Sequence, residues 1–105
     1  MDTPLITLAP VRSFIDELPL TTRECVYRSL ALLRKFGRQL PQPDSKKVTR
    51  ELFELRIRGK TQVRILYGFL GNAAVLTNAF LKKSRKIPPR EIELALARFF
   101  SIAQQ

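Results

Sequence analysis

The amino-acid sequence predicts an α+β fold in which helices pack against a three-stranded antiparallel meander. Three observations lead to this prediction. Apolar residues recur at helical spacing before Gly37, apolar and polar residues alternate through most of residues 52–81, and helical spacing returns after residue 88. A chain of 105 residues, 45% of them hydrophobic, has room for one modest core. We therefore expect a single domain over residues 1–105.

The N-terminal part predicts one short strand and two helices. Residues 5–8 are apolar enough for a strand, and residues 9–18 begin with Ala-Pro and form a short helix. Thr21 or Thr22 is expected to cap the second helix, and Gly37 to end it. The buried stripe of that helix follows the spacing i, i+4, i+7 and consists of Val26, Leu30 and Leu33.

Residues 52–81 predict the three strands of the meander. The first strand, residues 52–58, alternates between an apolar face (Phe53, Leu55 and Ile57) and a polar face. Glycine-containing turns at 59–61 and 71–72 separate it from strands at 62–69 and 73–81. Alternation places two arginines of the first strand on one face, at a spacing that suits successive phosphates: Arg56 and Arg58.

A last helix is expected after Pro88-Pro89, because proline is tolerated where the first amides of a helix lack partners. Its apolar stripe indicates that it packs on the sheet, although the same stripe could bind a partner. The stripe consists of Ile92, Ala95, Leu96, Phe99 and Ile102.

Positive charge is concentrated in the middle of the chain. The net charge is +10, and residues 46–90 carry all of it, with twelve basic residues against two acidic ones. Such a concentration favours a polyanionic partner such as nucleic acid over a merely solvated surface. The chain has no histidine and one cysteine, so histidine-dependent catalysis, an internal disulfide and a thiolate metal cluster are excluded. We interpret Cys25 as structural, and we expect no metal or other cofactor.

The N-terminus lacks the features of a secretion signal, and no run of apolar residues is long enough to span a membrane. A cytoplasmic location is therefore expected.

Four stretches of the sequence form a recognisable series. They are Glu51-Leu52-Phe53-Glu54-Leu55-Arg56, Val63-Arg64-Ile65-Leu66-Tyr67, Phe80-Leu81-Lys82-Lys83-Ser84-Arg85-Lys86 and Pro89-Arg90-Glu91-Ile92-Glu93-Leu94-Ala95. Together they resemble the RelE/ParE toxin superfamily, and within it the HigB-like, phage-derived branch of type II toxin–antitoxin systems. Their order and spacing match that branch over nearly the whole chain, whereas each stretch alone is a weak signal.

The resemblance implies a RelE-like fold and ribosome-dependent cleavage of messenger RNA without a metal ion. In that reaction the 2′-hydroxyl attacks the adjacent phosphate, and fixed cations stabilise the extra negative charge of the transition state. The candidate catalytic residues are Arg64, Arg56, Lys82 and Lys83. The residues expected to bind the RNA backbone or the ribosome are Arg58, Lys60, Arg85 and Lys86. Glu54 either accepts the 2′-hydroxyl proton or aligns Arg56 through a salt bridge.

The implied partners are messenger RNA, the ribosome and an antitoxin of helix-turn-helix type, through which alone the complex would bind promoter DNA; no membrane partner is expected. Two departures from the family pattern limit the transfer of roles. Ile87 stands where a threonine usually precedes the proline, and the C-terminal residues 101–105 contain no tyrosine. Tyr67 alternates with Arg64, which favours a place in the core over a catalytic role.

Two other functions are compatible with the sequence. One is inhibition of DNA gyrase, as in ParE-like relatives, although Arg64 and Lys82-Lys83 argue against it. The other is a basic module that binds nucleic acid or an antitoxin without catalysis. Binding without cleavage in the presence of ribosomes would favour the second.

Overall fold

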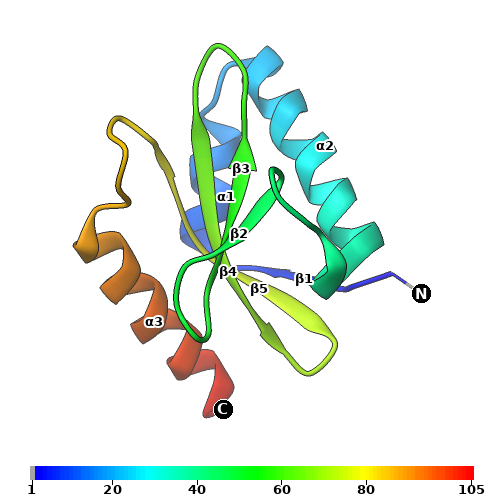
Figure 1. Cartoon of the computed structure of the whole chain (residues 1–105), viewed down its shortest axis with the longest axis vertical. Coiled ribbons are helices and arrows are strands. Elements are labelled where there is room, and N and C mark those ends of the chain that lie inside the picture. Colours follow the sequence, from blue (N-terminus) through cyan, green and yellow to red (C-terminus); the bar gives the residue numbers. More distant parts are fainter. Residues whose placement is uncertain (1) are drawn as a thin grey trace.

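The computed structural model describes residues 2–105 and contains a five-stranded sheet with helices on both faces (Figure 1). This architecture confirms the predicted α+β class. The elements, in chain order, are β1 (Leu5–Thr7), α1 (Ala9–Asp16), α2 (Leu20–Phe36), a 3-10 turn (Gly37–Gln39), β2 (Ser45–Lys47), β3 (Phe53–Ile57), β4 (Val63–Leu70), β5 (Ala73–Leu81) and α3 (Pro89–Ala103). None of the helices in this part of the chain is long and apolar enough to cross a membrane.

The strand order is β1-β5-β4-β3-β2, in which β3, β4 and β5 form the predicted antiparallel meander. Two edge strands extend it. β1 pairs in parallel with β5, and β2 pairs antiparallel with β3. The sequence analysis did not predict β2, because a strand of three residues with two lysines is too short to show alternation.

The ends of α2 show one prediction that is wrong and one that is confirmed. Neither Thr21 nor Thr22 caps the helix, because it already begins at Leu20 and has no side-chain cap. The Pro19 carbonyl accepts the amide of Arg23, so both threonines lie within the first turn. Gly37 does end α2, with a positive φ of 53° that glycine adopts without strain.

Two hydrophobic cores lie on opposite faces of the sheet, with α1 and α2 over one and α3 over the other (Figure 1). The first core includes the apolar face of β3 and β4 together with Val11, Val26 and Leu33. In the second core, Ala95 and Phe99 of α3 meet a set of buried residues on the sheet: Leu52, Leu66, Val75 and Phe80. The last helix therefore packs on the sheet, as the sequence predicts.

A bulge in β5 interrupts the regular pairing with β4. Tyr67 pairs with Leu76 but Leu66 pairs with Asn78, so Thr77 is an extra residue. The Thr77 carbonyl accepts a hydrogen bond of 2.9 Å from the Arg98 guanidinium of α3. Next to it, the side-chain amide nitrogen of Asn78 donates to the backbone carbonyl and the carboxylate of Glu91. These bonds hold α3 against the bulge. The extra residue also shifts the alternation of β5, so that the residues after it, such as Phe80, face α3.

Gly68 permits the close approach of α3 to β4. A Cβ atom at this position would lie 2.8 Å from both the Glu51 carbonyl oxygen and the Phe99 ring. We expect Gly68→Ala to lower the free energy of unfolding by about 1–3 kcal/mol, because the ring must move. Urea unfolding measures this loss. Gly59→Ala is the control, because neither glycine has a positive φ and a Cβ atom at Gly59 would meet only Cys25 Sγ, at 3.8 Å; a loss at Gly68 no greater than at Gly59 would contradict the steric explanation.

Candidate active site

A buried carboxylate gathers three cations on the face of the sheet that α3 partly covers. The side chain of Glu54 on β3 is only 2% exposed. Its Oε1 accepts a hydrogen bond of 2.8 Å from Nε of Arg56. Its Oε2 lies 3.5 Å from Nε of Arg64 and 3.9 Å from Nζ of Lys82. Three residues predicted to be catalytic, from three stretches of the chain, therefore meet at one carboxylate.

The pairing of β3 with β4 explains this convergence. Arg56 and Arg64 are directly opposite each other, and alternation puts Glu54 on the same face as both. Two opposed guanidinium groups repel, and Glu54 between them offsets that repulsion. The backbone amide of Lys82 donates to the Gln62 carbonyl, which continues the β4–β5 ladder and brings the lysine to the same end of the sheet.

Arg64 is the most buried of the three cations. It is 7% exposed, and its two terminal nitrogens donate to the Val63 carbonyl and to the Gln62 side chain. Burial lowers the pKa of Arg64, an effect that the nearby Glu54 carboxylate opposes. Arg64 thus adds charge to the site from beneath, whereas Arg56 and Lys82 remain partly exposed.

A cleft of about 350 Å³ opens above this cluster. Glu54, Arg56 and Lys82 form part of its wall, and Ile92 at the start of α3 contributes an apolar side. The other lining residues are Lys46, Lys47, Val48, Arg85, Lys86 and Ile87. Six cationic side chains therefore surround one cleft, in which Glu54 is the single carboxylate among the described lining residues. Such a cleft suits a phosphate group.

The predicted RNA-contacting residues are divided by the structure. Arg85 and Lys86 line the cleft, but Arg58 lies beyond the end of β3, where its guanidinium is 3.7 Å from the Asp44 carboxylate. Lys83, a predicted catalytic residue, is exposed and adjacent to Lys82 without lining the cleft. The edge strand β2 supplies two cations that sequence reasoning missed, Lys46 and Lys47. The pairing of Lys46 with Glu54 could be found only from the fold.

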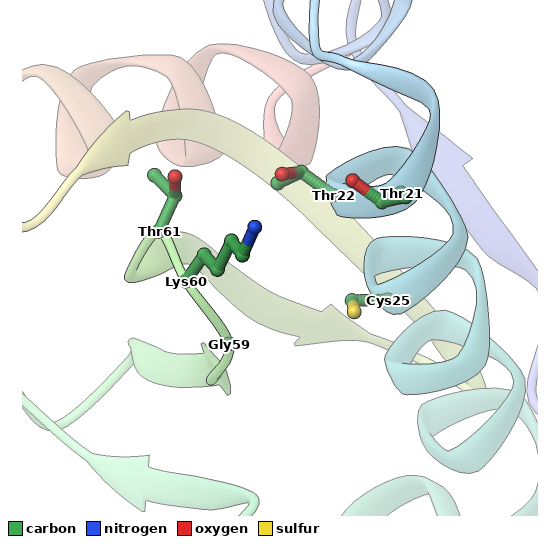
Figure 2. Close-up of a pocket in the computed structure, with 6 residues that line it drawn as sticks. All are labelled: Thr21, Thr22, Cys25, Gly59, Lys60 and Thr61. Carbon is green, nitrogen blue, oxygen red and sulfur yellow. The ribbon is translucent and has the colours of Figure 1, made fainter.

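Lys60 lies in a different pocket, of about 230 Å³, between the β3–β4 turn and the start of α2. Figure 2 shows Gly59, Lys60 and Thr61 on the turn, facing Thr21, Thr22 and Cys25 on the helix. Cys25 is half-buried and packs against the first core, and its sulfur accepts a hydrogen bond from Arg28. This pocket is separate from the set of side chains around Glu54.

Tyr67 lies in the core, as the alternation with Arg64 predicts. It is 1% exposed, and its hydroxyl shares a hydrogen bond with the buried Ser45 of β2. Burial raises the pKa of Tyr67, partly offset by the bond to Ser45. Across residues 2–105, no three His, Cys, Asp or Glu side chains gather closely enough to hold a metal ion.

Comparison with known proteins places this chain in a family. Residues 13–100 match the family described as Phage derived protein Gp49-like. Among solved structures, a mutant of the E. coli toxin RelE in the free state is similar, with a TM-score of 0.64 and 12% sequence identity over 97% of this chain and 99% of that one. No curated protein matches. The RelE/ParE resemblance is thereby confirmed: the chain belongs to the phage-derived Gp49-like family and has the RelE fold.

Proposed function

We propose that the chain is the toxin of a toxin–antitoxin pair and that it cleaves messenger RNA on the ribosome. The observation that carries this proposal is the convergence of Arg56, Arg64 and Lys82 on Glu54 beneath a cationic cleft. A cluster of fixed cations stabilises a phosphorane more than it stabilises the ground-state phosphodiester, because the charge on the phosphoryl oxygens increases. The family membership and the RelE fold support the same function.

The proposed reaction is an internal transfer at phosphorus. The 2′-oxygen forms a bond to the adjacent phosphorus, and the bond from phosphorus to the 5′-oxygen breaks. The products are a 2′,3′-cyclic phosphate and a 5′-hydroxyl, so no water is consumed. Arg56 and Lys82 contact the phosphoryl oxygens from the cleft wall, and Arg64 adds charge from below. Lys82 also supplies the proton to the departing 5′-oxygen.

Glu54 is proposed to have two roles in this reaction. Its Oε1 holds Arg56 in place through the 2.8 Å hydrogen bond. Its Oε2 is buried and lies near Arg64 and Lys82, but it makes no hydrogen bond within the described part of the chain. Because Glu54 belongs to the cleft wall, this oxygen is proposed to accept the 2′-hydroxyl proton as the 2′-oxygen attacks.

The proposed partner is an antitoxin of helix-turn-helix type that covers the cleft with acidic side chains. Lys46, Lys47, Arg85 and Lys86 present a surface that carboxylates complement. RNA and antitoxin would then compete for the same cations, so binding of the antitoxin suppresses cleavage.

The test is incubation of the purified protein with translating ribosomes, followed by mapping of the RNA ends. We expect fragments with a 2′,3′-cyclic phosphate and a 5′-hydroxyl. A 2′-deoxynucleotide at the cut site should abolish cleavage there, because it removes the attacking group. Intact RNA, or fragments with a 3′-hydroxyl, would refute the proposal. Inhibition of DNA supercoiling by gyrase with intact RNA would instead support the ParE-like function.

A further inference from the structure

A second cationic pocket, which we call the aromatic pocket, lies beside the cleft. It has a volume of about 350 Å³ and is lined by Arg38, Lys47, Arg50, Glu51, Phe53, Phe69 and Phe99. Lys47 on the edge strand β2 lines both this pocket and the cleft, so the two are adjacent. We infer that the aromatic pocket binds a nucleotide of single-stranded RNA that flanks the nucleotide in the cleft. The inference rests on the proposed function for the identity of the RNA in the cleft.

Arg38 provides a flat platform in this pocket. Its guanidinium carbon lies 4.5 Å from the centre of the Phe69 ring. One of its terminal nitrogens donates a 3.0 Å hydrogen bond to the carbonyl of Gly71 in the β4–β5 turn. Two contacts therefore fix the guanidinium plane, while the side chain as a whole is exposed. The face turned away from Phe69 is open to a ligand, and bases stack well on arginine planes.

The ring beneath Arg38 is itself held in place. Phe53, Tyr67 and Phe69 form a cluster with ring centres 5.5 to 5.6 Å apart. Tyr67 is buried, whereas Phe53 at the start of β3 and Phe69 near the end of β4 are half-buried. Lys47 lies 5.9 Å from the Phe53 ring. Partly exposed rings next to cations are the combination that binds single-stranded nucleic acids, because bases stack while phosphates pair with the cations.

Charge and shape together favour RNA over an acidic protein segment. Arg38, Lys47 and Arg50 outnumber Glu51, so the pocket favours an anion. An acidic helix satisfies the charges but makes no use of a guanidinium plane fixed on an aromatic ring. A nucleotide uses both, since it carries a phosphate and a planar base. An RNA strand that leaves the cleft past Lys47 meets this platform next.

The experiment measures binding of uncleavable 2′-O-methyl RNA without ribosomes, by fluorescence anisotropy. We use oligonucleotides of about three and about ten nucleotides, since single-strand sites commonly span 4–16 nucleotides. Arg38→Ala and Arg38→Lys should each weaken binding of the longer RNA about tenfold, the loss expected for one stacked base. The shorter RNA, which occupies only the cleft, should bind both variants like the wild type. Arg28→Ala, which removes an exposed arginine of α2, is the charge-matched control.

Three results would overturn the inference. The first is that Arg38→Lys binds the longer RNA with wild-type affinity, which would mean that the pocket recognises only the charge at this position. The second is an equal loss in Arg28→Ala and Arg38→Ala. The third is that the Arg38 variants lose affinity for an acidic protein partner but not for the longer RNA. Failure of the proposed function gives a different result. If the protein binds the longer RNA through Arg38 but does not cleave messenger RNA on ribosomes, the inference about the aromatic pocket stands and the proposed nuclease activity is refuted.

Discussion

Cleavage of ribosome-bound RNA by the Arg56→Ala variant is expected to be about 100- to 1000-fold slower than by the wild type. Arg56 is the cation held most closely by Glu54, at 2.8 Å, and it is 23% exposed at the cleft wall. Its removal eliminates a guanidinium that can donate two hydrogen bonds to the phosphate, where negative charge increases in the transition state. A single-turnover cleavage rate at saturating protein measures this loss without a contribution from binding.

Two comparisons separate this effect from a general loss of charge. Arg56→Lys keeps the charge but loses the second donor nitrogen, so its rate should fall between those of wild type and Arg56→Ala. Arg12→Ala removes an exposed arginine of α1, far along the chain from the cleft residues, and should cleave at the wild-type rate. Equal slowing by Arg12→Ala and Arg56→Ala would show that only net charge matters.

Replacement of Glu54 by glutamine should have the largest effect on stability. The substitution leaves Arg56, Arg64 and Lys82 close together without the carboxylate that they share. Removing one partner of a buried ion pair destabilises a protein by about 3 kcal/mol or more, because the other charge stays buried without compensation. For a domain of this size that corresponds to a fall in Tm of roughly 15 °C. Thermal unfolding followed by circular dichroism measures the change.

The anion dependence of that change provides a specific control. Inorganic phosphate should raise the Tm of Glu54→Gln more than that of the wild type, because the unpaired cations are then free to bind it. Glu24→Gln, at an exposed position of α2, should unfold like the wild type. A loss in Glu54→Gln no larger than in Glu24→Gln would contradict the role of Glu54 as the shared anion.

The same variant tests the proton-transfer role. At a temperature where it is folded, Glu54→Gln should cleave more slowly than Arg56→Ala, because it loses both the proton acceptor and the group that holds Arg56. Equal single-turnover rates of the two variants would leave Glu54 with a positioning role only.

The three strands of the meander were predictable, two of them from alternation and the third as a mostly apolar run after a glycine-containing turn. The third strand of the meander was predicted at residues 73–81, and β5 has the same limits. Alternation also placed Glu54, Arg56 and Arg64 with the polar faces of the first two strands, because successive side chains of a strand point to opposite faces. The fold class followed from these periods together with the helical stripes.

The rest of the candidate site could not be predicted, because it depends on pairing between segments that are distant in the sequence. β2 contributes Lys46 to the cleft because it pairs with β3. A three-residue stretch, Ser-Lys-Lys, contains no sequence pattern that predicts this pairing. The grouping of Arg58 with Arg56 on one face did not bring both to the cleft, because Arg58 follows the last paired residue of β3 and lies near Asp44. Spacing along one strand cannot report where that strand ends.

The bulge at Thr77 has a consequence for how the width of the cleft is set. The Thr77 carbonyl at the bulge requires a donor, and Arg98 in the second half of α3 supplies it. The opening residues of that helix provide Ile92 to the rim of the cleft. The helix α3 therefore connects the bulge of β5 to the rim of the cleft, through Arg98 and through Glu91 next to Ile92. We expect a change at Arg98, which does not line the cleft, to shift Ile92 and so to alter the space available to the substrate.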